Sequence, residues 1–376
     1  MGLRLVTRFA ATNHKLRTFH FQLPPMRAFL LQLCLFLAAT SVVMEGFFRL
    51  SGLAPEIPAA RYEANYALTL SDRAADSTGW YTYGKQAQIR APWRINAAGW
   101  NSAFDYRPDA SRPLVAVLGD SYIENLYCAP EAHLDYQMTQ YLPDGYRVYG
   151  FGRRGVPMSH FVPMTQYVKD EFAPEWIVYV INHRNVAESV ASLRRGRYFL
   201  QYDQQGDSLF TLPPQPYQPS RLKSLLGQSA TFRYFLANFT FRIQWPRLTL
   251  SAPDTPARPA AQLPQNQAIQ HRVTRRVLQD LMANAGDSRV LFVLHPNRPA
   301  VYAGQRPAPE SRALGIVRTE LDALGLPYLS LNRAFERAYD RDQQPFEFET
   351  NEHWNGYANA VAAEAIAAAL RQRLTP

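Results

Sequence analysis

Residues 114–121 read LVAVLGDS, five consecutive apolar residues followed by a Gly-Asp-Ser turn. A continuous apolar run of this length is typical of a strand that is buried on both faces of a sheet. Residues 147–151 (RVYGF), 176–181 (WIVYVI) and 289–294 (RVLFVL) repeat the pattern. The sequence therefore predicts four buried strands.

Segments of helical length separate these strands and follow the last one. They span residues 131–141, 160–171, 268–285 and 310–324, and the Ala-rich residues 356–374. Strands that alternate with helices favour a mainly parallel sheet that is covered on both faces. We therefore expect an α/β protein whose residues 114–376 form a three-layer α/β/α sandwich of flavodoxin-like type.

Two further parts of the chain do not follow this alternation. Residues 246–266 hold five prolines and few large apolar residues, which is typical of a loop or linker. An aromatic helix is expected just before them, over residues 231–244. We interpret residues 186–266 as an irregular insertion beside the functional site, and residues 49–113, rich in Tyr, Trp and Ala, as an N-terminal extension.

The N-terminus is basic and then apolar. Residues 1–27 contain five Lys and Arg and no Asp or Glu, and residues 28–44 read AFLLQLCLFLAATSVVM. A membrane span needs about 20 apolar residues, and Gly46–Phe48 extend the run. Basic residues before a span keep the N-terminus in the cytoplasm. We expect a cytoplasmic leader (1–27), a single-pass anchor (28–48) in a bacterial inner membrane, and a periplasmic remainder.

Two alternatives to the anchor stay open. Small residues at 38–41 would suit a cleaved signal peptide, although no clean Ala-x-Ala site stands at the end of the apolar run. A helix buried in the protein core is the other alternative.

Composition narrows the function classes. The 376 residues are 47% apolar and 13% aromatic, which fits a globular protein with a sizeable core. The formal net charge is +9, but five of these charges lie in the leader. The rest are too diffuse to indicate a nucleic-acid partner. Cys34 and Cys128 support neither a disulfide framework nor a thiolate zinc site, and no His-rich ligand spacing occurs, so we expect no metal and no cofactor.

Four segments resemble the conserved blocks of the SGNH (GDSL-type) hydrolase family. They are, in chain order, residues 119–124 (GDSYIE), 150–155 (GFGRRG), 177–185 (IVYVINHRN) and 351–355 (NEHWN). The resemblance runs from about residue 90 to about residue 373. As an ordered set the four segments are specific, whereas each alone is weak.

The resemblance implies a serine hydrolase with a Ser–His pair. Ser121 would be the nucleophile, and His353 would be the base that a serine hydroxyl needs at neutral pH. The backbone N–H groups of Ser121 and Gly155 and the amide of Asn185 would form the oxyanion hole. Asn182 is the alternative to Asn185.

One position departs from the family pattern. Where the family has an Asp that orients the His, this chain has Asn351. An Asn oxygen can accept a hydrogen bond from the ring, but an Asn amide would favour the wrong tautomer, and that change costs about 10⁴ in kcat in a serine protease. Glu349, Glu352 or a backbone carbonyl would be substitutes for Asn351, and an inactive site is a further alternative.

The resemblance implies an esterase acting on acyl or acetyl groups of a cell-envelope polysaccharide or exopolysaccharide. Alternatives are a polysaccharide O-acetyltransferase with the same Ser–His machinery, with a multi-span membrane acyltransferase as partner, and a non-catalytic polysaccharide-assembly subunit. Arg153 and Arg154, next to Gly155, would meet an acidic sugar or face solvent. His183 and His295 are weaker candidates for site residues than His353.

Overall fold

The computed structural model describes residues 26–71, 77–109, 111–218, 220–239 and 262–374. By its internal contacts the chain divides into two units, residues 1–47 and 48–376. Most of the expected basic leader and most of the expected proline-rich segment lie outside the described residues.

The first unit contains most of helix α1 (Met26–Ser51). Its stretch Ala28–Ser51 has 24 residues and is long and apolar enough to cross a membrane, since a span needs about 20 residues. The helix runs through Glu45, so the two apolar runs of the sequence form one continuous element. The expected helix of spanning length is present.

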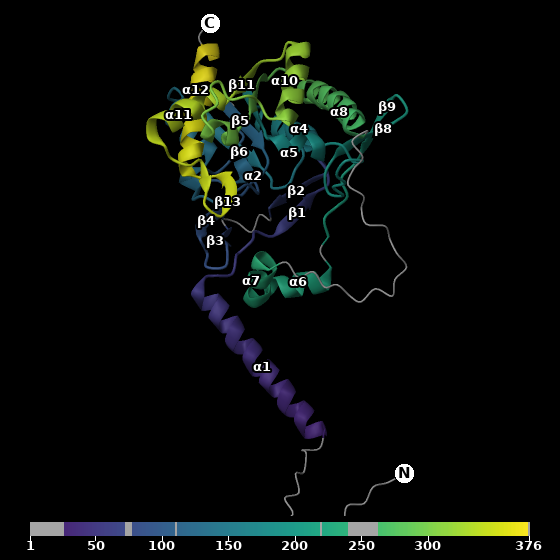
Figure 1. The fold of residues 1–376 in the computed structure, drawn as a ribbon, viewed down its shortest axis with the longest axis vertical. Coiled ribbons are helices and arrows are strands. Elements are labelled where there is room, and N and C mark those ends of the chain that lie inside the picture. The colour runs from purple at the N-terminus through teal and green to yellow at the C-terminus, as the bar shows by residue number, and fades with distance from the viewer. Residues whose placement is uncertain (1–25, 72–76, 110, 219, 240–261, 375–376) are drawn as a thin grey trace, which may run out of the picture. The chain divides into compact units, whose positions relative to one another are not determined.

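Five parallel strands form the central sheet of the second unit (Figure 1), in the order β11-β10-β7-β5-β6. They are β5 (Leu114–Gly119), β6 (Arg147–Gly152), β7 (Trp176–Ile181), β10 (Arg289–Leu294) and β11 (Tyr328–Ser330). The first four are the predicted strands, so the α/β prediction is confirmed. Counted along the chain, the order is 2-1-3-4-5, which is flavodoxin-like, and it reverses between β5 and β7.

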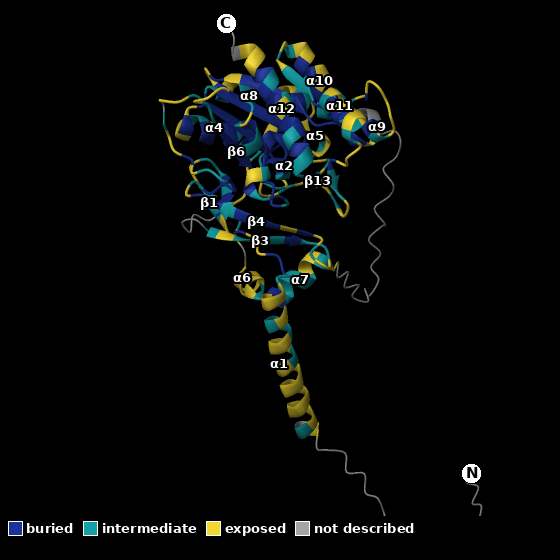
Figure 2. Ribbon diagram, turned by 90° about the vertical axis from the view of Figure 1, so that its left-hand side faces the viewer, coloured by how far each residue is buried: buried dark blue, intermediate teal, exposed yellow. Residues whose placement is uncertain are grey.

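Helices cover both faces of this sheet. Successive side chains of a strand point to opposite faces, so Ala116 of β5 packs into one apolar core and Val117 into the other. The first core is covered by α4 (Phe161–Phe172), α8 (Gln262–Ala285) and α10 (Arg312–Leu324). The second is covered by α3 (Leu134–Met138), α9 (Arg298–Tyr302), α11 (Asn332–Asp342) and α12 (Gly356–Leu374). Figure 2 shows the buried strands between exposed helix faces.

Two details of the sheet region differ from the prediction. Strand β11 was not expected, because its three residues are only half-buried and make no apolar run. The expected helix over residues 131–141 is shorter, a 3₁₀ turn η1 (Pro130–Ala132) followed by α3.

Two antiparallel hairpins of the second unit lie in the expected N-terminal extension. They pair β1 (Ala60–Glu63) with β2 (Leu68–Ser71), and β3 (Ser77–Tyr83) with β4 (Ile89–Ile95). The buried Trp100 after β4 packs edge-on against Phe151 of β6, with ring centroids 5.2 Å apart. The N-terminal extension is thus joined to the core of the sheet.

The described part of residues 186–266 is more regular than the expected irregular insertion, and the aromatic helix expected over residues 231–244 is present there as α7 (Ala230–Asn238). That part contains the end of α5 (His183–Glu188), the hairpin β8 (Gln201–Gln205) with β9 (Ser208–Leu212), and the helices α6 (Arg221–Gln228) and α7 (Ala230–Asn238). The polar strand QYDQQ gives no apolar signal. Its tight turn relies on Gly206, whose φ of +57° a glycine adopts without strain.

Candidate active site

The carboxyl edge of the sheet carries the residues that follow its strands. Ser121 opens helix α2 (Ser121–Glu124) after β5, Gly155 lies three residues after β6, and Asn182 follows β7 directly. The strand order reverses between β5 and β7, and open α/β sheets bind ligands at such a point. The hairpin β12 (Glu347–Phe348) and β13 (Asn351–Trp354) brings the fourth segment to the same edge.

Ser121 and His353 are in direct contact. The Ser121 Oγ lies 2.8 Å from the His353 Nε2, although 232 positions separate them along the chain. Both side chains are half-buried. This distance is within the range that a nucleophile and its general base require. The structure thus brings together the two residues that the sequence assigned to the reaction.

Asn351 orients the His353 ring through its side-chain oxygen. The Asn351 Oδ1 accepts the backbone N–H of His353 at 2.9 Å, and it lies 2.6 Å from the ring Nδ1. A backbone N–H can only donate, so the atom that it meets must be the amide oxygen. The same oxygen therefore accepts the Nδ1 proton. The Nε2 lone pair then faces Ser121, which is the tautomer that a general base needs.

The surroundings of His353 favour its neutral form. Burial lowers the pKa of the ring most, and together with the nearby Arg184 and Arg298 guanidinium groups it brings this pKa to about 4. Its ring stacks on Tyr127 with centroids 4.1 Å apart and lies 4.9 Å from the ring of Tyr122. Asn351 brings no charge that would oppose these effects. The His353 ring is therefore unprotonated at neutral pH, and its imidazolium form is poorly stabilised.

Asp120 links the turn that carries Ser121 to helix α5. Its side chain caps α2 by accepting the N–H of Tyr122 at 3.1 Å, and its other oxygen accepts the amides of Asn182 and Asn185. Burial raises the pKa of the Asp120 carboxyl to about 6, in spite of these donors. The cap keeps Ser121 at the start of its helix.

The two candidate asparagines occupy different positions. Asn185 is fully buried, and its amide nitrogen donates to Asp120 and to the Val156 carbonyl, both at 3.1 Å. These two bonds use both of its N–H groups. Asn182 lines the pocket with Ser121 and has one amide N–H on Asp120, which leaves the second N–H of that amide. The geometry favours Asn182 over Asn185 for contact with an oxyanion.

Gly155 also reaches the pocket and is exposed. Its φ is +74°, in the left-handed region that glycine adopts without strain. A Cβ placed there would meet the Phe199 ring only at 3.9 Å, so backbone conformation and not space calls for glycine.

A small pocket opens over the Ser–His pair. Its volume is about 200 Å³, and its lining includes Ser121, His353 and Gly155. Arg184 of α5 and Glu352 of β13 also line it and form an ion pair, with side chains 53% and 47% exposed. The pocket has room for a short acyl group beside Ser121. Glu352, which the sequence offered as a substitute for Asn351, is paired with Arg184 instead.

Sequence reasoning missed two residues that position the base. Arg298 at the start of α9 donates to the Glu352 carbonyl at 2.7 Å and to the Glu347 carboxylate at 2.8 Å. It thereby holds the hairpin that presents His353. Tyr127 supplies the stacking partner of the ring. Neither position belongs to a motif, and only the tertiary structure identifies them.

The competing histidines take other places. His183 lines the pocket, and His295 is buried and stacks on Trp354 with centroids 4.4 Å apart. Within the part of the chain that is described, no three His, Cys, Asp or Glu side chains gather closely enough to hold a metal ion.

Comparison with known proteins finds similarity among solved structures. No family model matches the sequence. No curated protein matches it either. Est24, a carbohydrate acetylesterase from Sinorhizobium meliloti, is 10% identical and covers 70% of this chain and 100% of its own, with a TM-score of 0.33. The native aryl esterase of M. smegmatis is 8% identical over 69% and 99% of the two chains, with a TM-score of 0.34.

A third similar structure is a two-domain esterase active on acetylated mannans. It is 10% identical, and the match covers 70% of this chain and 50% of that one, with a TM-score of 0.36. Identities and TM-scores this low leave the functional conclusion to the geometry of the site itself.

Proposed function

We propose that this chain is an SGNH-type serine esterase that removes acyl groups, such as acetyl, from a cell-envelope polysaccharide or exopolysaccharide. The observation that carries the proposal is the 2.8 Å contact between Ser121 and His353, whose ring is held by the Asn351 oxygen. The sheet edge on which they lie is where a parallel α/β sheet binds its ligand.

The reaction proceeds in two balanced steps. His353 Nε2 takes the hydroxyl proton while Ser121 Oγ bonds to the ester carbonyl carbon, and the proton then passes to the departing sugar oxygen as its bond to carbon breaks. The acyl group remains on Ser121. Water next gives a proton to His353 and attacks the acyl carbon. The bond from this carbon to Ser121 Oγ then breaks, His353 returns the proton to Oγ, and the carboxylic acid leaves.

The oxyanion of each tetrahedral intermediate needs hydrogen-bond donors. The backbone N–H groups of Ser121 and Gly155 and the second N–H of the Asn182 amide are the donors that we assign. Removing one such donor typically costs about 10²–10³ in kcat.

A transferase that uses the same acyl-enzyme is the second candidate, and one observation favours it. Asn351 brings no negative charge to His353, whose pKa is about 4. Such a weak base activates free water slowly, whereas a sugar hydroxyl held beside the acyl group gains from its position. Acetyl transfer to a glycan, with a multi-span membrane acyltransferase as donor, is thus compatible with the site.

Turnover of an aryl acetate tests the proposal and separates the two candidates. The full-length chain in neutral detergent should release 4-nitrophenol from 4-nitrophenyl acetate, and Ser121→Ala should not. An esterase continues to release acetate when an oligosaccharide acceptor, neutral or acidic, is added. A transferase gives acetylated oligosaccharide in place of acetate. Correctly folded protein without any release would favour the non-catalytic assembly subunit.

A further inference from the structure

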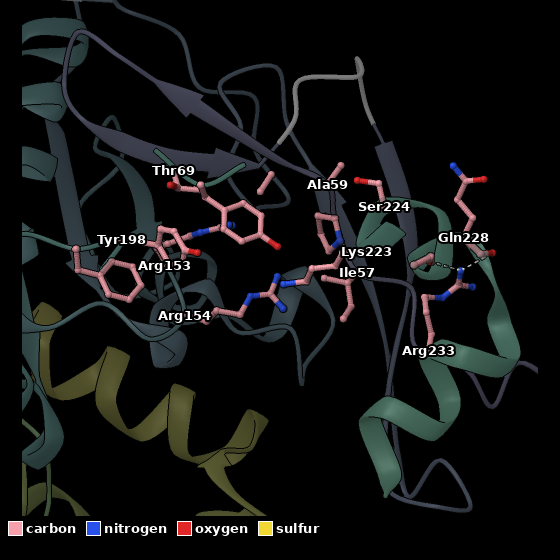
Figure 3. A pocket seen from close by; sticks show the side chains of 15 residues that line it. Ile57, Ala59, Thr69, Arg153, Arg154, Tyr198, Lys223, Ser224, Gln228 and Arg233 are labelled. Carbon is pink, nitrogen blue, oxygen red and sulfur yellow. Dashed lines mark hydrogen bonds between the residues drawn. The ribbon is translucent and has the colours of Figure 1, made fainter. Parts of the chain in front are cut away.

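A second cavity, of about 570 Å³, shares part of its lining with the catalytic pocket. Arg154, the neighbour of Gly155, lines both. The walls come from the segment before β1, the loop after β6, the segment at Tyr198, and helices α6 and α7. Figure 3 shows the side chains of Arg154 and Lys223 extending into this cavity toward one another.

The cavity is strongly basic. Four of its lining residues are cationic, namely Arg153, Arg154, Lys223 and Arg233, and none of the lining residues is acidic. The buried Glu124 pairs with Arg153 at 3.3 Å and with Arg154 at 3.2 Å, from behind the lining. One carboxylate therefore faces two of the four cations.

The other two cations make no contact with a carboxylate among the described residues. Arg233 donates to three backbone carbonyls, those of Pro55 at 2.8 Å and of Gly227 and Gln228 at 3.1 Å. These bonds fix the position of the guanidinium but leave its charge uncompensated. The Lys223 ammonium lies 5.2 Å from the centre of the Tyr217 ring. The cavity thus keeps a surplus of positive charge.

Aromatic rings flank these cations. Tyr198 and Tyr217 meet edge to face with centroids 5.2 Å apart, and Tyr198 is 40% exposed. Tyrosines offer a rigid surface that is apolar on its faces and can form hydrogen bonds through its hydroxyl. Such a surface suits the ring of a sugar, which has apolar C–H faces and a polar edge.

We infer that this cavity holds an acidic sugar unit of a uronic-acid-containing glycan whose acyl group enters the pocket at Ser121. The inference rests on the proposed function and adds a substrate class to it. Arg154 joins the two sites, and Phe199, which lines the cavity, lies against Gly155 of the pocket. Arg and Lys side chains bind carboxylates through charge-assisted hydrogen bonds.

Binding to a charged probe and to its neutral counterpart tests the inference. The probes are hexagalacturonate and the same oligomer with all carboxylates methyl-esterified, titrated calorimetrically into the full-length chain in neutral detergent. The acidic form should bind at least about 10-fold more tightly, since its carboxylates can form charge-assisted hydrogen bonds that the methyl esters cannot form. Raising the salt from about 0.05 M to about 0.5 M should weaken it, because salt screens exposed charges.

Two matched lysine variants locate the effect. Lys223→Gln should weaken binding of the acidic oligomer about 10-fold. Lys169→Gln removes the same charge on α4, where Lys169 pairs with the exposed Asp287. It should bind both oligomers like the wild type. Equal affinity for the two oligomers, no affinity for either, or equal losses in the two variants would overturn the inference.

Turnover of 4-nitrophenyl acetate keeps the two proposals apart. An active enzyme that does not distinguish the oligomers contradicts the acidic-glycan subsite and leaves the esterase intact. A chain that binds the acidic oligomer but never releases 4-nitrophenol contradicts the esterase and leaves the cavity as an acidic-glycan site.

Discussion

Asn351 orients His353 without bringing a negative charge to it. Its oxygen accepts both the backbone N–H and the ring Nδ1 proton of His353, so the ring has the tautomer that a base requires. What the amide cannot supply is electrostatic stabilisation of the imidazolium that forms when Ser121 gives up its proton. At the scale of single residues, the candidate site therefore has the geometry of a Ser–His pair but lacks a negative charge that would stabilise the imidazolium.

Replacing Asn351 by Asp should increase the turnover of 4-nitrophenyl acetate by about 10-fold at pH 7. The carboxylate keeps the acceptor and adds a charge that stabilises the imidazolium. This gain in turnover is smaller than the loss of about 10⁴ in kcat that the opposite change, Asp to Asn, causes in a serine protease, because His353 already has the required tautomer. Asn351→Ala, which removes the acceptor, is the control and should lose activity. An unchanged or lower rate in Asn351→Asp would refute this role for the position.

The pH profile should reflect the lowered pKa of His353. The ring can accept the Ser121 proton only when it is unprotonated, and its pKa is about 4. Activity should thus stay nearly constant as the pH falls from 7 to about 5 and be half lost near pH 4. Asn351→Asp should move this midpoint upward. Circular dichroism at each pH shows that the fold persists. A midpoint near 6.5, the ordinary value for histidine, would contradict the account.

At the scale of elements, helix α5 decides which asparagine reaches the pocket. Asn182 is its N-cap and Asn185 its third residue, and the two side chains cap each other's backbone N–H groups. In such a capping box, the third residue points back toward the cap and not outward. The helix thus makes Asn185 a structural residue and leaves Asn182 beside Ser121.

Two substitutions in α5 should separate stability from turnover. Asn182→Ser keeps a good N-cap residue but removes the amide donor, so kcat should fall about 10²-fold while the fold stays stable. Asn185→Ala leaves buried partners unsatisfied and should reduce the free energy of unfolding by about 1–3 kcal/mol. Its kcat should change little while it is folded. A large loss of kcat in Asn185→Ala with little change in Asn182→Ser would assign the contact with the oxyanion to Asn185.

The sequence predicts elements well where their pattern is local. Strands β5, β6, β7 and β10 are continuous apolar runs, and Ser121 stands directly after the first of them. The residue pair Ser121 and His353 could be proposed from the motif blocks. The choice between Asn182 and Asn185 could not, because it depends on where α5 begins.

Other parts of the site depend on contacts that are distant in sequence. Arg298 acts on His353 through a carbonyl 54 residues away along the chain, and no local pattern indicates such a contact. The basic cavity joins Arg154 with Lys223 and Arg233, which belong to three separate segments. Strand β8 of the hairpin β8–β9 is mostly polar, so the pairing of the two strands could not be predicted either.

At the scale of the whole molecule, the location that we propose for the protein follows from helix α1 and the basic leader before it. We propose a single-pass anchor in a bacterial inner membrane with residues from about 50 onward in the periplasm. Alkaline phosphatase fused after Pro376 should be active, and green fluorescent protein at the same place should stay dark. Replacing the five basic residues of 1–27 by Gln should weaken the preference for a cytoplasmic N-terminus. A bright fusion with inactive phosphatase would contradict this topology.

Covalent labelling of Ser121 tests directly whether this serine is the nucleophile. The full-length chain is treated with a fluorophosphonate, and peptide mass spectrometry locates the adduct. We expect a phosphonyl group on Ser121, with no adduct in Ser121→Ala and much slower labelling in His353→Ala, since the two side chains act as a unit. Folded wild-type protein that stays unlabelled at Ser121, beside a serine esterase labelled under the same conditions, would contradict this role for Ser121.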